Sequence, residues 1–187
     1  ANAARARAAW EEGKVAGAQM VALTEMFLTG YQTQDLVMKP AFCDAAMEWV
    51  GRLARDCADG PALGIGGPWR DPQGQLFNAY FVLKGGKVHA RVQKHHLAMD
   101  TVFDEARLFD PGPVSGPYSV GGVRIGTPIC EDAWSDDVTE TLSETGAEIL
   151  LVPNGSPYYR NKYDRRVNVM VSRVIETHLP LVYLNMV

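Results

Sequence analysis

Three side chains of different chemistry, a carboxylate, an ammonium and a thiol, each come at or shortly after the end of an apolar run. They are Glu25, Lys94 and Cys130. Because α/β enzymes place catalytic groups at or just past the carboxyl ends of strands, the three side chains could meet in one pocket. A free thiol has a pKa of about 8.5, so it needs a nearby cation or base to become a nucleophile. This combination indicates acyl transfer, in which Cys130 attacks a carbonyl carbon, Glu25 takes the thiol proton and Lys94 stabilises the oxyanion.

Helices and strands alternate along the chain, which predicts an α/β domain. Strands are expected over 19–23, 62–65, 77–83, 87–92, 123–129, 149–152 and 181–184. Helices are expected over 1–12, 40–57, 138–145 and 163–177, with Gly13 ending the first and a long ordered loop over 95–117. Gly85-Gly86 lies between two strands and predicts an antiparallel hairpin, so the sheet should be mixed rather than purely parallel.

Charge and composition narrow the class of protein. The 187 residues carry 18 Lys plus Arg and 22 Asp plus Glu, a formal net charge of −4. This balance argues against a protein that coats nucleic acid or anionic lipid. No apolar run approaches the roughly 18–20 residues that span a bilayer, and no secretory leader is visible over 1–7. We therefore expect neither nucleic acid nor membrane as a partner.

Cysteine usage favours a reducing compartment. The chain has 3 cysteines, Cys43, Cys57 and Cys130, and an odd number in a chain of this size does not indicate a disulfide framework. A cytoplasmic location is the corresponding prediction. Neither a CxxC pair nor a His-x-x-x-His pair occurs, so we expect no metal site.

Two adjacent histidines, His95 and His96, directly follow Lys94. Side chains of adjacent residues in an extended segment point to opposite sides, so at most one imidazole could face a pocket with Cys130. Support of the loop that carries Lys94 is the favoured interpretation.

The residues around the three reactive groups resemble the motifs of the nitrilase superfamily of carbon-nitrogen hydrolases. The matching segments are 23–31 (LTEMFLTGY), 94–97 (KHHL) with 102–105 (VFDE), and 128–134 (PICEDAW), in the order and spacing of the family. With 155–158 (GSPY), they are most similar to one branch, the glutaminase domains of glutamine-dependent NAD⁺ synthetases. The resemblance covers about 17–186, nearly the whole chain.

The resemblance implies a four-layer α-β-β-α sandwich with mixed sheets, and a role for each reactive group. Cys130 is then the nucleophile, Glu25 the general base and Lys94 the group that stabilises the tetrahedral intermediate. Four further residues match positions near the glutamine pocket of the family: Tyr31, Glu131, Trp134 and Ser156. Among them, Glu131 could hold the α-ammonium of glutamine.

The resemblance also implies partners. The substrate would be the side-chain amide of L-glutamine, and the ammonia released would pass to a synthetase domain that amidates deamido-NAD⁺. No cofactor is expected for the hydrolase domain, since ATP and Mg²⁺ would serve the synthetase domain. No GxxxxGK[ST] or GxGxxG motif occurs in the chain. Homo-oligomers are usual in the superfamily, so we expect one here.

Some features depart from the family pattern. The family often has Leu-Pro-x-Tyr-Gly after the lysine motif, whereas Leu97 is followed here by Ala-Met-Asp-Thr, with Asp100 where the tyrosine usually stands. Residue 1 is Ala rather than Met, and an apolar strand runs to the end of the sequence, so we expect residues 1–187 to be one incomplete hydrolase domain, cut at both ends.

Two alternatives stay open at this point. The first is a stand-alone nitrilase-type amidase or carbamoylase that acts on another small amide. The second is a non-catalytic scaffold with the shape of an amidase.

Overall fold

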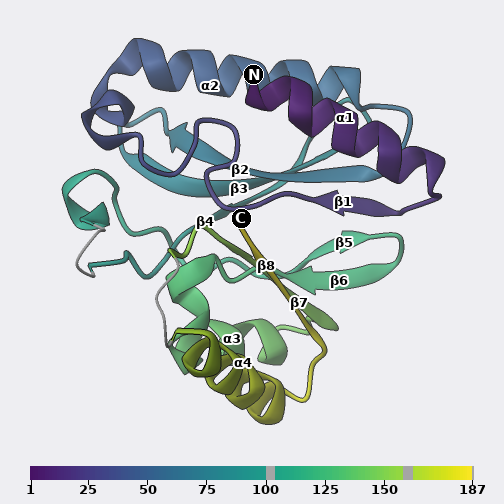
Figure 1. Ribbon diagram of the computed structural model, residues 1–187, viewed down its shortest axis with the longest axis vertical. Coiled ribbons are helices and arrows are strands. Elements are labelled where there is room, and N and C mark those ends of the chain that lie inside the picture. Colours follow the sequence, from purple (N-terminus) through teal and green to yellow (C-terminus); the bar gives the residue numbers. More distant parts are fainter. Residues whose placement is uncertain (100–103, 158–161, 187) are drawn as a thin grey trace.

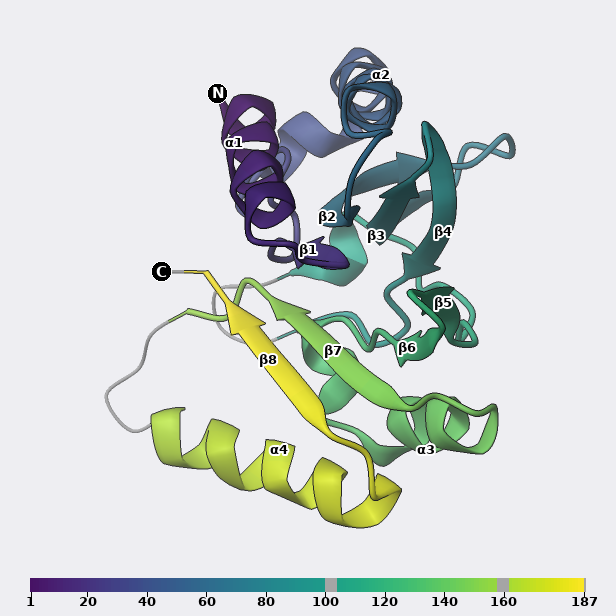
Figure 2. The ribbon, with the colours of Figure 1, turned by 90° about the vertical axis from the view of Figure 1, so that its right-hand side faces the viewer.

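Two four-stranded sheets face each other, and a pair of helices covers the outer face of each sheet (Figure 1). The computed structural model describes residues 1–99, 104–157 and 162–186. Turned by 90°, the molecule shows the same four layers, with α1 and α2 at one side and α3 and α4 at the other (Figure 2). The expected α-β-β-α sandwich is confirmed.

The first sheet has the order β1-β2-β3-β4. Its strands are β1 (Met20–Ala22), β2 (Ala62–Arg70), β3 (Leu76–Lys84) and β4 (Lys87–Gln93). The covering helices are α1 (Asn2–Val15) and α2 (Pro40–Asp56). β1 is parallel to β2, and the other pairs are antiparallel, as the predicted hairpin requires. Gly85 and Gly86 both have positive φ, 57° and 81°, which is the backbone that a tight two-residue hairpin needs.

The second sheet has the order β5-β6-β7-β8. Its strands are β5 (Tyr118–Val120), β6 (Val123–Gly126), β7 (Ile149–Asn154) and β8 (Leu181–Asn185), and its helices are α3 (Asp136–Glu144) and α4 (Lys162–Thr177). β5 and β6 are antiparallel, and β6, β7 and β8 are parallel. Short 3-10 helices lie in the connections: η1 (Gln34–Met38), η2 (Glu105–Arg107) and η3 (Cys130–Ala133).

β3 shows why the layers stack as they do. Phe81 and Leu83 point into the core beneath α1 and α2, whereas Tyr80 and Val82 point into the core between the two sheets. Alternate residues of a strand face opposite sides, so a strand that is apolar on both faces must be covered on both. The apolar run of β3 therefore places this strand between the helix layer and the second sheet.

Three predicted boundaries were wrong. α1 continues past Gly13, because Gly13 lies where a Cβ would collide with Val21 of β1, and it serves close packing rather than helix termination. β2 runs on to Arg70 instead of ending at Ile65. The strand before Cys130 ends at Gly126, and β5 was not predicted at all.

None of the described helices combines the length and the apolar character that crossing a membrane requires.

Gly66 of β2 offers a test of how closely the first sheet holds the segment after β1. A Cβ on Gly66 would collide with the backbone of residues 24–26, whereas a Cβ on the adjacent Gly67 would meet Leu28 Cβ at 3.5 Å, an ordinary contact. We expect Gly66→Ala to lower the free energy of unfolding by about 1–3 kcal/mol, the usual effect of overpacking. Gly67→Ala is the matched control and should change it by less than about 1 kcal/mol. Urea unfolding followed by circular dichroism measures both, and equal effects would contradict the close approach.

Candidate active site

Glu25 sits in a turn that the first sheet holds in place. Beyond β1 the chain stays on β2, since Leu23 N donates to Gly64 O at 2.8 Å and Leu28 N donates to Gly66 O at 3.0 Å. Between these bonds the backbone turns sharply, and Met26 has a φ of 50°, in the left-handed region. The turn directs the Glu25 side chain into the interior, where its exposed fraction is 0%.

Lys94 follows β4 directly and is also fully buried. Its Nζ donates to Glu25 Oε1 at 2.8 Å and to Glu105 Oε2 at 2.7 Å. A buried ammonium is stable only when its charge is compensated and its N–H groups are bonded. Two carboxylates meet that requirement here, and an ammonium has three N–H groups, so these two bonds leave capacity for one more acceptor.

Glu105 is a second buried carboxylate of the site, and the sequence analysis did not single it out. It lies at the start of η2 and accepts hydrogen bonds from Tyr31 Oη at 2.8 Å and from Ala98 N at 2.7 Å. Asn78 Nδ2 lies 2.9 Å from both Glu105 Oε1 and Glu25 Oε1, so it links the two carboxylates. The signal that could have found Glu105 was its place at the end of the VFDE segment.

Cys130 reaches the same cluster from the second sheet. It follows β6 by four residues, begins η3 and has a φ of 49°. A non-glycine residue in this region is strained, and such residues gather at functional sites. The charges of Glu25, Lys94 and Glu105 all act on the pKa of the Cys130 thiol, so the sulfur belongs to the same cluster. Gly155, just past β7, donates its N–H to Glu25 Oε2 at 2.8 Å, so both sheets hold this carboxylate.

Asp132 ties the turn of Cys130 to the loop after Lys94. It is 1% exposed, and its Oδ1 accepts the backbone N–H groups of His95 at 3.0 Å and His96 at 2.7 Å. Its Oδ2 accepts the N–H of Ile129 at 3.0 Å. This one carboxylate thereby fixes both the backbone that follows Lys94 and the backbone that precedes Cys130. Sequence reasoning missed this role, because nothing in the spacing of Asp132 shows which amides it meets.

The pKa values of Glu25 and Glu105, which share Lys94 as a partner, are shifted in opposite directions. Burial raises the pKa of Glu25, and the negative charge of Glu105 adds to that effect, although Lys94 opposes it. At Glu105 burial acts in the same direction, but the charge and hydrogen bond of Lys94 outweigh it, and the pKa lies below its usual value. Carboxylates whose pKa values are pushed apart divide the acid and base roles between them, and here Glu25 is the better proton acceptor.

The pKa values of Lys94 and of the Cys130 thiol are both raised. Desolvation acts to lower the pKa of Lys94, but Glu25 and the other anionic groups outweigh it, so the pKa is raised and the ammonium stays charged. Burial and the charge of Glu25 raise the pKa of the Cys130 thiol, although Lys94 lowers it. The resting Cys130 side chain is therefore a protonated thiol, and Glu25 is the carboxylate whose raised pKa suits it to accept that proton.

The four residues matched to the glutamine pocket lie around this cluster in different settings. Tyr31 packs against Gly155 so closely that a Cβ there would collide with its ring, and its hydroxyl donates to Glu105. Glu131 is half-buried in η3, next to Cys130. Trp134 follows η3, and the guanidinium of Arg165 lies 5.1 Å from the centre of its ring.

Ser156 is held by the protein itself. Its N–H donates to Asn185 Oδ1 at 3.0 Å, and its carbonyl oxygen accepts from Asn185 Nδ2 at 3.1 Å. Arg166 Nη2 donates to Ser156 Oγ at 3.1 Å and to Pro157 O at 2.6 Å. These bonds fix the turn after β7 that presents Gly155 to Glu25.

A cavity of about 260 Å³ opens beside Tyr31 and Glu105. The other lining residues are Met26, Gln32, Gln34, Asp35, Asp104, Arg107, Leu108 and Phe109. The cavity borders the cluster on the side of Glu105. Asp100, the residue that departs from the family pattern in this loop, lies outside the described residues.

The thiol pKa gives one prediction. Glu25→Gln removes the negative charge that contributes most, after burial, to the raised pKa of Cys130, so alkylation of Cys130 by iodoacetamide should reach half its maximal rate at a lower pH. Glu105→Gln, the matched control, should shift the midpoint in the same direction by less. Mass spectrometry of the Cys130 peptide separates it from the other two cysteines. A midpoint that stays constant or rises in Glu25→Gln would contradict the assignment.

Asp132 gives a second prediction. Asp132→Asn presents an amide group to at least one of three N–H donors, and we expect the free energy of unfolding to fall by about 1–3 kcal/mol. Asp136→Asn, an exposed change on α3, should lower it by less than about 1 kcal/mol. Urea unfolding of both variants is the measurement, and an Asp132→Asn variant as stable as the parent would refute the role of this carboxylate.

Several relatives are similar to the chain in sequence. The glutamine-dependent NAD⁺ synthetase of Rhodobacter capsulatus is 61% identical over 187 residues, which are 100% of this chain and 34% of that protein. The synthetase of the same name from Xanthomonas campestris pv. campestris is 34% identical over 176 residues, 91% of this chain and 31% of that protein. The chain thus spans about a third of the length of these relatives.

Solved structures and the family comparison agree with this result. The glutamine-dependent NAD⁺ synthetase of Acinetobacter baumannii superposes with a TM-score of 0.93 at 28% identity, over 100% of this chain and 35% of that one. An amidase from Nesterenkonia sp. shares the fold, with a TM-score of 0.84 at 24% identity over 98% of this chain and 69% of its own. Residues 1–187 match the family described as carbon-nitrogen hydrolase. This chain belongs to the carbon-nitrogen hydrolase family.

Proposed function

We propose that residues 1–187 form the glutaminase part of a glutamine-dependent NAD⁺ synthetase. The observation that supports this chemistry is the buried cluster in which the Cys130 thiol, Glu25 and Lys94 converge. The observation that supports glutamine as the substrate is the 61% identity, over the whole chain, to a relative named for its dependence on glutamine.

The first half of the reaction forms a thioester. Glu25 accepts the proton of Cys130 Sγ as the sulfur attacks the side-chain amide carbon of glutamine. The third N–H of Lys94, together with the backbone N–H of Glu131, stabilises the oxyanion that develops. Glu25 then returns the proton to the amide nitrogen, the C–N bond breaks, and ammonia leaves a γ-glutamyl thioester on Cys130.

The second half releases glutamate. Glu25 takes a proton from a water molecule, which attacks the thioester carbon, and the oxyanion again lies beside Lys94. The C–S bond breaks and the sulfur recovers its proton from Glu25. The same carboxylate acts twice, and the raised pKa of Glu25 suits an acceptor that must also give the proton back.

The partners of the proposal follow from this reaction. L-glutamine is the substrate, and a synthetase domain accepts the ammonia, which is consistent with relatives about three times as long as this chain. The hydrolysis uses protein groups alone, so ATP and Mg²⁺ belong to the amidation of deamido-NAD⁺. Tyr31 contacts Glu105 of the cluster, and Glu131 and Trp134 lie in and directly after the 3-10 helix that begins at Cys130, so we assign these three residues to glutamine binding. The bonds of Ser156 favour a supporting role.

The two alternatives have less support. A stand-alone amidase has a structural counterpart in the Nesterenkonia enzyme, but at 24% identity that likeness concerns the fold. A scaffold without activity has no need of two carboxylates and a lysine buried around a thiol, because an apolar cluster would be as stable. The homo-oligomer and the cytoplasmic location remain predictions.

Release of glutamate from L-glutamine by the full-length protein tests the proposal. Cys130→Ala should lower kcat by at least about a thousandfold, as loss of a covalent nucleophile does in other hydrolases. Cys57→Ala is the matched control, since Cys57 is buried at the end of α2, and it should leave the rate within about threefold. Hydrolysis that survives Cys130→Ala would refute the mechanism. Faster hydrolysis of short aliphatic amides than of glutamine would favour the stand-alone amidase.

A further inference from the structure

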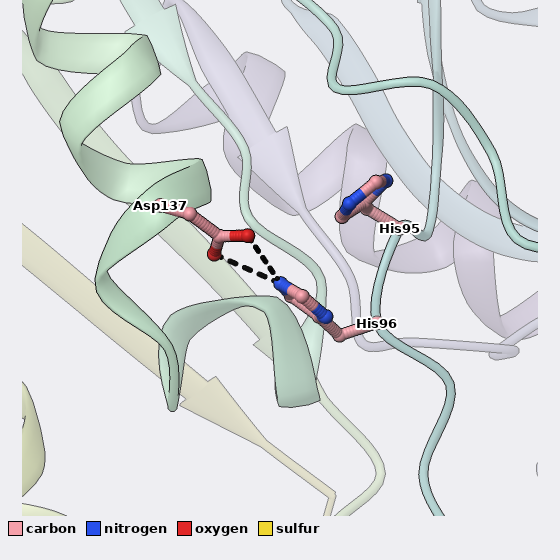
Figure 3. Close-up of side chains that lie close together, drawn as sticks. All are labelled: His95, His96 and Asp137. Carbon is pink, nitrogen blue, oxygen red and sulfur yellow. Dashed lines mark hydrogen bonds and ion pairs between the residues drawn. The ribbon is translucent and has the colours of Figure 1, made fainter.

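A second group of polar side chains gathers outside the reactive cluster. His95, His96 and Asp137 each offer one ligand atom, and these atoms lie within 4.8 Å of one another. The two histidines come from the loop after β4, and Asp137 comes from the first turn of α3 (Figure 3). The imidazole rings were expected to point apart, yet their centroids are 4.7 Å apart. Residues 41 positions apart in sequence form this group, which is why motif spacing did not indicate it.

His96 and Asp137 already lie close to the separation that two ligands of one metal ion have. His96 Nε2 lies 2.8 Å and 2.9 Å from the two carboxylate oxygens of Asp137. Two ligands of a tetrahedral Zn²⁺ with bonds of about 2.0–2.1 Å are about 3.3 Å apart, so this pair needs to separate by only about half an ångström. The His96 and Asp137 side chains are 31% and 51% exposed, which leaves them room to move and lets an ion enter.

The hydrogen bond of His95 fixes a tautomer that suits a metal ligand. Its Nδ1 lies 2.7 Å from the carbonyl oxygen of Gly112, and beside a carbonyl this nitrogen must carry the proton. The proton on Nδ1 leaves the lone pair on Nε2, the nitrogen available to an ion. A backbone carbonyl that fixes the tautomer of an imidazole in this way is the usual outer-shell partner of a metal-binding histidine.

The group is connected to the catalytic cluster through backbone. His95 follows Lys94 directly, and both histidine N–H groups are bonded to Asp132, which also holds the residue before Cys130. An ion bound to the two imidazoles and to Asp137 would join this loop to α3 by three coordinate bonds. The loop after Lys94 would then be fixed on both sides, by Asp132 within and by the ion at the surface.

We propose that His95 Nε2, His96 Nε2 and the Asp137 carboxylate form a site for a divalent transition-metal ion of the zinc class, which fastens the loop after Lys94 to α3. Two imidazoles and one carboxylate suit Zn²⁺, Co²⁺, Ni²⁺ and Cu²⁺ and are poor ligands for Ca²⁺ or Mg²⁺. Three protein ligands leave a fourth position for water. The site takes no part in the hydrolysis of glutamine and stands whether or not that proposal holds.

Titration of the chelator-treated full-length protein with ZnCl₂, followed by calorimetry, tests the site, and the absorption of bound Co²⁺ reports its geometry. We expect saturable binding of one ion and a higher Tm in its presence. His96→Gln and Asp137→Asn should each weaken binding of Zn²⁺ by at least about tenfold. The matched controls are His89→Gln on β4 and Asp136→Asn, the neighbour of Asp137 on α3, which should bind as the parent does.

The outcomes separate this site from other sources of zinc affinity. Absence of saturable binding overturns the proposal, and so does binding that both His96→Gln and Asp137→Asn leave unchanged. Binding that Cys130→Ala abolishes and His96→Gln preserves would place the ion on the catalytic thiol and would also overturn it. Circular dichroism of each variant without metal shows whether it is folded, and Co²⁺ absorption bands that change in Asp137→Asn but not in Asp136→Asn support the assignment.

Discussion

The buried ion triad of Glu25, Lys94 and Glu105 is the interaction on which the site depends. All three side chains are almost completely removed from water, and the Lys94 ammonium lies within hydrogen-bond distance of both carboxylates, so it compensates their buried charge. Removal of one member of such a group costs about 3–5 kcal/mol, because a charge is left buried without a partner. The three charges are therefore stable only if the end of β1, the end of β4 and η2 meet at one point.

The proposed nucleophile, Cys130, and its proposed base, Glu25, come from different sheets, so the packing between the sheets sets the distance between them. Glu25 and Lys94 extend from the first sheet, and Cys130 follows β6 of the second. Cys130 and Ile129 pack in the same core as residues of β3 and β4. Gly155 crosses the same gap by donating to Glu25. In the proposed mechanism the apolar layer between the sheets therefore positions the reacting groups as well as stabilising the fold, since a shift of one sheet against the other would separate sulfur from carboxylate.

Much of this arrangement could be predicted from the sequence, because it rests on local signals. The Gly85-Gly86 hairpin follows from turn chemistry, α2 from its helical spacing, and the three reactive groups from their places near strand ends with family motifs around them. β2 extends beyond the predicted 62–65 through Gly66, Gly67 and Pro68, residue types that are depleted in strands. Pro68 is tolerated because β1 pairs with β2 only as far as Gly64, so no strand needs its missing N–H on that side. Glu105 was missed although it ends the VFDE segment, whereas the role of Asp132 could not be predicted, since it depends on which buried donors the tertiary fold brings to this carboxylate.

The carboxylates around Lys94 also limit what that amine can do. Because its pKa is raised, the nitrogen keeps its proton and has no lone pair with which to condense with an aldehyde or a keto acid. A carbonyl compound that reached this ammonium would therefore not form an imine with it. Of the groups in the cluster, this leaves the thiol of Cys130 as the one that can form a covalent bond to carbonyl carbon in the proposed reaction, while Lys94 contributes charge and an N–H group.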